Sequence, residues 1–238
     1  MPNSAISDKA ESWIAQASAA PAFAGLAPGD LARLLAPATP LQFPQARAVF
    51  TRGEPAGSVY LVLSGTVSIS TLAASGKRIT VEIFQRDDLL GEIAAIDGGL
   101  RTADATATEP SRLLGIPAAT FRSVLAGSAP LANTLLRLAT ARLRHTYALL
   151  EDASLRTVEL RLARQVLYLL KLGATGEARV RLRARMHQDE LADLLGITTR
   201  SVINVLNKWR AEALVSFDGR TAQLTILDIG RFRELAQE

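Results

Sequence analysis

The chain has 238 residues, of which 48% are hydrophobic and 21% charged, with a formal net charge of +4. This composition is typical of a globular protein with room for one large or two modest domains. The chain contains no cysteine, which excludes disulfides, thiolate catalysis and cysteine-ligated iron–sulfur or zinc sites. The two histidines, His145 and His187, lie far apart without a carboxylate at ligand spacing, so neither a metal nor a haem is expected.

The sequence has no apolar run long enough to span a bilayer, and its first 16 residues lack the basic start and apolar core of a signal peptide. We therefore expect a cytoplasmic protein without a membrane partner. Residues 157–238 carry 13 lysines and arginines against 10 acidic residues, whereas residues 1–156 carry 14 against 13. This mild surplus favours a polyanionic partner for the C-terminal part.

Helical spacing of apolar residues runs from residue 7 to residue 36, and the pattern changes to that of strands from Leu41. Short β-rich runs separated by glycine turns occupy residues 48–50, 59–63, 66–70, 79–84, 105–107 and 112–116. Strands of this kind predict a β-sandwich or jelly roll. We interpret Tyr60 and Gly65, within these runs, as architectural residues.

Residues 91–103 contain a carboxylate, Glu92, followed about ten residues later by a guanidinium, Arg101. Gly91 has no Cβ and lets a ligand approach the backbone closely. The apolar run 93–96 predicts a single buried turn whose first N–H groups can meet an anion. Arg101 can hold a phosphate through two parallel hydrogen bonds, and Glu92 can accept hydrogen bonds from sugar hydroxyls. An internal ion pair between Glu92 and Arg101 is the alternative.

A long helix is predicted from about Pro130, with residues recurring at steps of three and four and polar residues in the middle. The predicted seam consists of Leu131, Leu135, Leu138, Arg142, His145 or Thr146, Leu149 and Ala153. Such a seam is buried against a copy of the same helix, which predicts a two-fold homodimer. Packing of the helix on its own domain is the alternative. Residues 154–157 are the predicted hinge.

Residues 188–206 predict two helices joined by a tight turn. The first helix is amphipathic and ends at Gly196, and Thr198 can cap the second. The second helix exposes residue types that bind base edges and phosphates, namely Thr199, Arg200, Ser201 and Asn204. This arrangement indicates a helix-turn-helix, although a purely structural helix pair is the alternative.

Residues 214–227 predict a β-hairpin with a favoured Asp-Gly turn at Asp218 and Gly219, which corresponds to a wing with a basic tip. Its Arg220, together with Lys208 and Arg210 of the second helix, is expected near DNA phosphates.

Residues 91–103 resemble the phosphate-binding cassette of cyclic-nucleotide-binding domains: Gly-Glu, a short apolar turn, a glycine-containing link, then Arg and two small residues. Gly91, Glu92, Ile93, Arg101, Thr102 and Ala103 match this pattern, while Leu100 replaces a frequent proline. The resemblance implies that Arg101 binds the cyclic phosphate, Glu92 the ribose 2′-hydroxyl, and Thr102 the phosphate or the base. Cyclic AMP is the expected ligand and cyclic GMP the second candidate. In the family the long helix also touches the base, which places Thr146, and less firmly Tyr147, near it.

The order of these features is similar to that of the CRP–FNR superfamily of bacterial regulators along nearly the whole chain. The resemblance implies an α+β fold. A cyclic-nucleotide-binding β-roll would cover residues 1–128, a dimerisation helix 129–156 and a winged helix-turn-helix 157–238. Its expected partners are a two-fold DNA operator, a second copy of the chain and RNA polymerase. Thr199 and Arg200 replace a frequent Arg/Glu pair, and Asn204 a frequent Arg, so a different operator is expected.

Two other functions compete with a nucleotide-responsive regulator. In one, the regulator acts without a nucleotide and the cassette residues pair with one another. In the other, the chain is the cyclic-nucleotide-binding regulatory subunit of an enzyme. The second needs a catalytic constellation in residues 157–238, where the sequence shows neither cysteine nor a phosphate loop and only an isolated His187. The chain is therefore not expected to be an enzyme.

Overall fold

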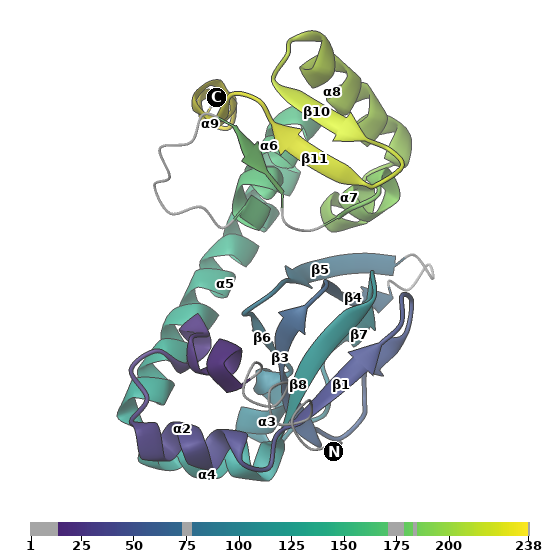
Figure 1. Ribbon diagram of the computed structural model, residues 1–238. Helices are drawn as coiled ribbons and strands as arrows, with labels where there is room; N and C mark the ends of the chain where they lie inside the picture. Colours follow the sequence, from purple (N-terminus) through teal and green to yellow (C-terminus); the bar gives the residue numbers. More distant parts are fainter. Residues whose placement is uncertain (1–13, 73–77, 171–178, 183–184, 238) are drawn as a thin grey trace, which may run out of the picture. The chain divides into compact units, whose positions relative to one another are not determined.

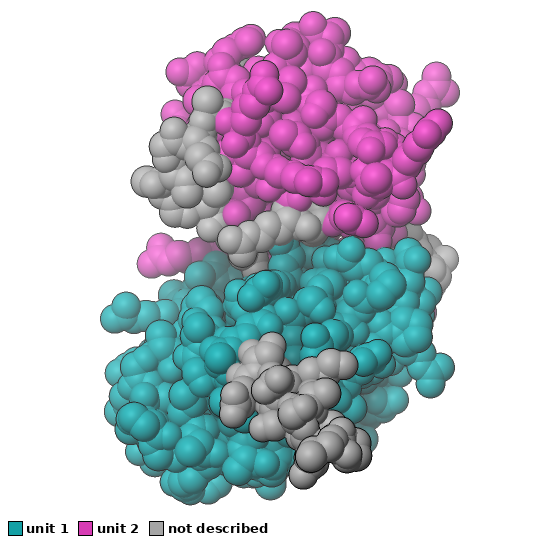
Figure 2. All heavy atoms as spheres, in the orientation of Figure 1, with its two compact units in different colours: residues 1–71, 83–142 teal, residues 72–82, 143–238 magenta. Residues whose placement is uncertain are grey.

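The computed structural model of the chain describes residues 14–72, 78–170, 179–182 and 185–237 (Figure 1). Its contacts group the chain into two compact units, residues 1–71 with 83–142 and residues 72–82 with 143–238 (Figure 2). The boundaries of these units differ from those of the predicted domains 1–128, 129–156 and 157–238. The units are defined by contacts alone, so the predicted domain boundaries stay a prediction.

The first unit contains the β-roll and the helices that pack on it. Residues 14–18 are helical, which is the described part of the predicted helix from residue 7. The elements that follow are η1 (Pro21–Phe23), α2 (Pro28–Leu35), β1 (Thr39–Phe43), β2 (Ala48–Phe50), β3 (Ser58–Ser64), β4 (Val67–Leu72), β5 (Arg78–Phe84), β6 (Leu89–Leu90), α3 (Glu92–Asp97), β7 (Asp104–Ala107), β8 (Ser111–Pro117), α4 (Ala118–Gly127) and α5 (Ala129–Leu155). Strand β5 and helix α5 continue into the second unit.

Two antiparallel sheets, with strand orders β1-β8-β3-β6 and β2-β7-β4-β5, form the roll. The side chains of β3 alternate between two apolar clusters, as the period of a strand requires. Leu61 packs with the helices and Leu114, while Val62 packs with Phe50 and Leu113 in the second cluster. The predicted jelly-roll arrangement is thereby confirmed.

Helix α5, at 27 residues, presents two different apolar faces. Leu131 and Leu135 of the predicted seam are buried in the core of the first unit, so the assignment of these residues to a dimer seam is wrong. The apolar residues that remain exposed are Leu136, Leu143, Tyr147 and Leu150. The three leucines follow one another at steps of seven residues, which places them on one stripe of the helix. No helix in the described part of the chain is both long and apolar enough to cross a membrane.

The second unit contains a winged helix. Its elements after α5 are α6 (Val158–Leu170), β9 (Val180–Arg181), α7 (Gln188–Leu195), α8 (Thr199–Ala211), β10 (Val215–Asp218), β11 (Gln223–Ile226) and α9 (Ile229–Leu235). The sheet has the order β10-β11-β9, so β9 lies at one edge of it. Trp209 of α8 packs edge-on against Phe232 of α9, with 5.0 Å between ring centroids, and both side chains are fully buried.

The tip of the wing differs from the predicted Asp-Gly turn. Asp218 pairs with Gln223, which leaves a loop of residues 219–222 instead of a two-residue turn. The positive φ of the loop is at Ala222, at 52°, and not at Gly219. Asp218 holds the loop by accepting hydrogen bonds from the Arg220 N–H at 2.9 Å and the Thr221 hydroxyl at 2.8 Å. These bonds lower the pKa of the Asp218 carboxyl, the hydroxyl of Thr221 having the largest effect.

Candidate functional site

The cassette is built on α3, a helix of six residues between two glycines in the left-handed region. Gly91 precedes it at a φ of 78°, and Gly98 ends it at a φ of 73°. Only the small Ala94 and Ala95 are buried, while Ile93 and Ile96 are 53% and 46% exposed. The predicted buried turn is therefore a helix that buries only its alanines and leaves its isoleucines exposed.

Arg101 is buried, with 4% of its surface exposed. Its Nη1 donates to the Gly91 carbonyl at 2.7 Å, and its Nη2 donates to the Ser58 carbonyl at 2.6 Å. The Phe50 ring covers one side of the guanidinium, with 4.1 Å between Cζ and the ring centroid, and Tyr60 lies at 5.9 Å. A Cβ on Gly91 would lie 2.7 Å from Arg101 Nη1, so only glycine leaves room for the guanidinium.

The charge of Arg101 is not neutralised by a bonded carboxylate within the described residues. Its guanidinium donates to neutral carbonyls, and its buried Nε has no hydrogen-bond partner in the described part of the chain. Burial lowers the pKa of Arg101, and the nearby Tyr60, Glu54 and Glu92 offset part of that effect. A buried guanidinium with an unused donor is an arrangement that favours an anionic ligand.

Glu92 does not pair with Arg101 but with Arg142 of α5. Arg142 Nη1 lies 2.5 Å from Glu92 Oε1, its Nη2 donates to the Leu89 carbonyl at 3.0 Å, and its Cζ lies 4.7 Å from the Phe84 ring centroid. The alternative of an internal Glu92–Arg101 ion pair is therefore wrong, and the pair that is present joins the cassette to α5. Arg142 was predicted in the dimer seam. Its spacing with the buried Leu135 and the partly buried Leu138 was the available signal for an inward position.

The remaining predicted ligand residues lie in different surroundings. Thr102 is exposed and directly follows Arg101, while Ala103 is buried. Thr146 lies on α5 one turn after Arg142 and is exposed, and it belongs to the second unit. The role of Thr146 at a bound base stays a prediction.

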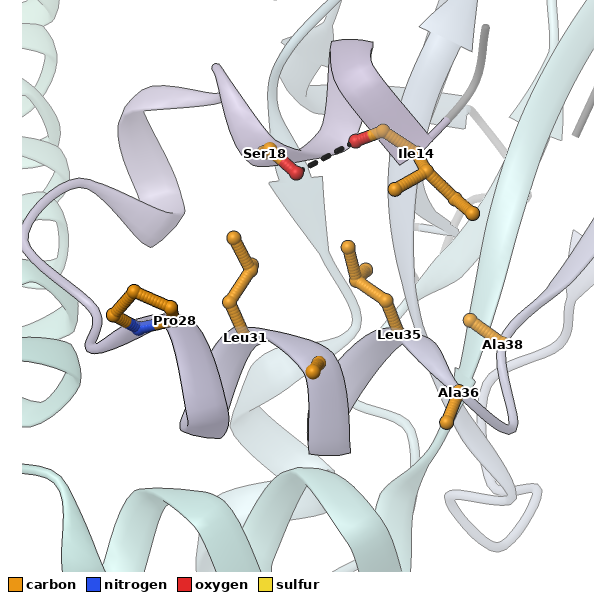
Figure 3. Close-up of a pocket in the computed structure, with 8 residues that line it drawn as sticks. Ile14, Ser18, Pro28, Leu31, Leu35, Ala36 and Ala38 are labelled. Carbon is orange, nitrogen blue, oxygen red and sulfur yellow. Dashed lines mark hydrogen bonds between the residues drawn. The ribbon is translucent and has the colours of Figure 1, made fainter. Parts of the chain in front are cut away.

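A separate apolar groove lies beside α2 and has a volume of about 490 Å³ (Figure 3). Leu31 and Leu35 project into it from α2, and Ile14 and Ser18 lie on its opposite wall. The only hydrogen bond drawn there runs from the Ser18 hydroxyl to the Ile14 carbonyl, at 2.8 Å, within one helical turn. The groove offers no charged group among these residues, and it is distinct from the cassette.

The helix-turn-helix is formed by α7 and α8. Gly196 ends α7 at a φ of 65°, and Arg161 of α6 donates from Nη2 to the carbonyl of Leu195 at 2.6 Å. Thr198 caps α8 as predicted, because its Oγ1 accepts from the N–H of Ser201 at 3.2 Å. The turn between the helices is therefore fixed at both ends.

The predicted DNA-contacting residues of α8 lie opposite its buried side. Thr199, Arg200 and Asn204 are exposed, whereas Val202, Leu206 and Trp209 are buried. Lys208, predicted as a phosphate contact, forms a 2.7 Å ion pair with Glu159 of α6. The other carboxylate oxygen of Glu159 accepts a 2.9 Å hydrogen bond from Trp209 Nε1. Arg210 and, on the wing, Arg220 are exposed.

A β-roll that carries this cassette, followed by a long helix and a winged helix-turn-helix, defines a transcription regulator with a nucleotide-binding domain. The sequence pattern of the cyclic nucleotide-binding domain matches residues 40–128, and that of the Crp-like helix-turn-helix domain matches residues 131–235. The chain belongs to the CRP–FNR superfamily of transcription regulators. The predicted family and fold are thereby confirmed, as is the prediction that the chain is not an enzyme.

Three similar proteins illustrate the range of the superfamily. The CRP-like cAMP-activated global transcriptional regulator of Mycobacterium tuberculosis is 30% identical over 204 residues, which cover 85% of this chain and 91% of that protein. The structure of FixK2 from Bradyrhizobium japonicum aligns with a TM-score of 0.72 at 21% identity, covering 83% of this chain and 96% of FixK2. The c-di-GMP responsive global regulator CLP of Xanthomonas campestris aligns with a TM-score of 0.65 at 24% identity, covering 83% and 98%. The last two support the fold.

Proposed function

We propose that the chain is a cyclic-nucleotide-responsive regulator whose nucleotide binds at residues 91–103. The observation that carries this proposal is Arg101, a buried guanidinium with carbonyl partners, an unused Nε donor and no bonded carboxylate within the described residues. A cyclic phosphate would supply the missing negative charge. Because Arg101 is only 4% exposed, phosphate binding would require the groups that cover the guanidinium to move, so that its unused donor reaches a phosphate oxygen.

The sugar and the base would be bound by the residues around Arg101. Glu92 accepts a hydrogen bond from Arg142, and its second oxygen would accept from the ribose 2′-hydroxyl. Gly91 and Ile93 would bring their backbone N–H groups to the phosphate, with Ala103 leaving room for it. Thr102 would serve either the phosphate or a guanine amino group. The cAMP-activated relative supports cyclic AMP as the ligand, and cyclic GMP is the second candidate.

We propose further that the active form is a homodimer on a two-fold operator. The exposed stripe of Leu136, Leu143, Tyr147 and Leu150 would pack against the same stripe of a second α5. Each α8 would then enter a major groove, with Thr199, Arg200, Ser201 and Asn204 toward the bases and Thr198, Lys208 and Arg220 toward phosphates. RNA polymerase would be the further partner, in the cytoplasm.

A regulator that needs no nucleotide is the second candidate, because Arg142 already satisfies one oxygen of Glu92. Calorimetric titration with cyclic AMP and with cyclic GMP, followed by fluorescence anisotropy on an operator fragment, separates the two candidates. Loss of a buried guanidinium–phosphate contact typically costs about 3–5 kcal/mol, or roughly two to three orders of magnitude in affinity. Arg101→Leu should therefore lose nucleotide binding and the gain in operator affinity.

The matched control is Arg47→Leu, which removes an exposed arginine of the same unit. It should bind nucleotide like the wild type. Equal operator affinity of the wild type with and without either nucleotide would favour the second candidate. Thr102→Ala assigns the hydroxyl: a greater loss for cyclic GMP places it at guanine, and equal losses place it at the phosphate.

A further inference from the structure

Three elements of the second unit meet at Tyr168. Its ring on α6 lies face to face with the His145 ring on α5, with 3.3 Å between centroids and 3° between planes. Its hydroxyl lies 3.0 Å and 3.1 Å from the two carboxylate oxygens of Glu82 on β5, to which it donates. Tyr168 therefore connects the first helix after the hinge with the helix before it and with the β4–β5 hairpin.

An ion pair also joins the two helices on either side of the predicted hinge. Arg164 Nη1 of α6 lies 2.6 Å from Asp152 Oδ1 of α5, and the Asp152 side chain is almost fully buried. Gln165, next to Arg164, is 2% exposed, and its Oε1 has no hydrogen-bond partner among the described residues. His145 and Asp152 lie two turns apart on α5, and Arg164 and Tyr168 one turn apart on α6. A continuous polar face therefore joins α5 to α6 across residues 156–157.

We call His145, Asp152, Arg164 and Tyr168, with Glu82, the joint. On α5 and β5, the residues next to the joint contact the cassette or its partner Arg142. Arg142, which pairs with Glu92, precedes His145 by three residues and so lies on the same side of α5. Phe84, which lies under Arg142, follows Glu82 by two residues and so points to the same face of β5. On α5, Arg142 is thus bonded to the cassette and His145 stacks on Tyr168, while on β5 Phe84 contacts Arg142 and Glu82 accepts from Tyr168.

We propose that Tyr168 is a positioning residue that couples the cassette to the DNA-binding half, through its stack on His145 and its hydrogen bond to Glu82. This inference rests on the proposed nucleotide response. A nucleotide can shift the protein between two states only by its differential affinity for them, and an element whose contacts differ between the states can carry that shift to the DNA-binding half. The joint supplies such a contact, because α6 cannot turn relative to α5 and β5 without breaking the stack or the Tyr168–Glu82 bond.

The joint also predicts a pH dependence. Burial lowers the pKa of His145, and the Gln165 amide and the Asp152 carboxylate offset part of that effect. The charged and polar groups around His145 and Tyr168 are Gln165, the Asp152–Arg164 pair, and Glu82 at the Tyr168 hydroxyl. In the unfolded chain His145 has an ordinary histidine pKa of about 6.5, so near and below that pH it binds more protons than in the folded chain. The stack is therefore fully stable above that pH and is weakened as the pH falls below it.

The test measures the ratio of operator affinities with and without cyclic AMP, from about pH 8 to about pH 5.5. Tyr168→Ala and His145→Ala remove the stack and should lower this ratio at least about fivefold, with nucleotide binding retained. Tyr168→Phe keeps the ring but loses the Glu82 bond, and should lower the ratio by less. His145→Phe keeps a stacked ring that cannot titrate, so it should preserve the ratio and abolish its pH dependence.

Glu151→Gln is the control, because it removes an exposed carboxylate of α5 outside the joint. Unchanged ratios in both alanine variants would overturn the inference, as would a pH dependence that survives His145→Phe. Hydrogen exchange at residues 156–157 distinguishes a failure of the coupling role of Tyr168 from a failure of the proposed nucleotide response. A wild-type ratio of one overturns the proposed function and the coupling role together. Unchanged exchange in Tyr168→Ala shows that the joint does not hold the hinge and overturns the inference alone.

Discussion

The position of Arg101 depends on a glycine ten residues earlier in the chain. Gly91 both accepts a hydrogen bond from Arg101 Nη1 through its carbonyl and leaves the space that Nη1 occupies. Its φ of 78° lies in the left-handed region, where other residues are strained. Geometry and space therefore select the same residue at the start of the cassette.

Gly91→Ala should consequently destabilise the protein and impair the cassette. The left-handed φ alone costs an L-residue roughly 1–2 kcal/mol, and the new Cβ would also displace Nη1. Denaturant unfolding should show this loss, together with weaker nucleotide binding in calorimetry. Gly29→Ala is the control: it lies inside α2 with nothing within 4 Å of the new Cβ, and alanine there should be neutral or stabilising by up to about 1 kcal/mol. Equal stabilities of the two variants would contradict the expected strain.

Single residues also show the limits of prediction from the sequence. Gly91 and Arg101 could be predicted because both lie in one short pattern. Ser58 and Arg142 could not, because they reach the cassette from 43 and 50 residues away in the sequence, and only the folded roll brings them there. Phe50, which covers the guanidinium, has no polar atom in its side chain to mark it as part of a binding site.

At the scale of elements, α8 is oriented by its buried side. Trp209 is held both by Phe232 and by Glu159, and Thr198 fixes the first turn. The side of α8 that carries Arg200 and Asn204 is therefore fixed before DNA is bound. Such preorganisation lowers the entropy cost of binding.

Arg200→Ala and Arg220→Ala should have different effects on DNA binding. Removing a base contact at Arg200 should cost roughly 1–3 kcal/mol on the operator and relax preference at one base pair. Removing a phosphate contact at Arg220 should weaken all DNA sequences alike and reduce the salt dependence by about one ion. Anisotropy titrations on operator and random DNA at several salt concentrations measure both. Equal weakening of operator and random DNA by Arg200→Ala would assign Arg200 to the phosphates instead.

Elements were predictable where their pattern is local. Six strands of the roll (β2, β3, β4, β5, β7 and β8) and both helices of the helix-turn-helix follow from period and caps, whereas the two-residue β6 does not. The wing loop could not be predicted, because Asp218 closes it through side-chain hydrogen bonds that compete with the Asp-Gly turn. The inward face of α5 could not be predicted either, since one apolar leucine resembles another whether it meets its own domain or a copy of the chain.

At the scale of the whole molecule, α5 would join nucleotide, hinge and partner subunit. Its Arg142 binds the cassette, its His145 and Asp152 bind α6, and its Leu143 and Leu150 remain exposed. Exposed apolar residues that line up on one side of a helix favour a partner of the same chemistry.

Leu143→Glu should therefore convert the proposed dimer into a folded monomer. Leu143 is 52% exposed within one chain, so the substitution leaves the chain's own core intact, while two glutamates meeting at a two-fold axis repel one another. Light scattering coupled to gel filtration should show half the mass, with the unfolding midpoint of the nucleotide domain retained. Arg137→Glu, at an exposed position of the same helix outside the stripe, should stay dimeric. A dimeric Leu143→Glu would assign the interface to another surface.

The faces of α5 also fix its length. The helix carries an inward stripe with Arg142, an exposed apolar stripe with Leu143, and a polar stripe with Arg144, each one residue from the next. One residue inserted after Arg142 would rotate everything beyond it, α6 included, by about 100° relative to the part of the helix before it. Leu143 and Leu150 would then leave the stripe that begins at Leu136, and Tyr168 would turn away from Glu82. A seven-residue insertion would restore every stripe while lengthening the helix by about 10 Å. Natural length variation among relatives should therefore fall in the loops of the roll, and in α5 only in whole heptads.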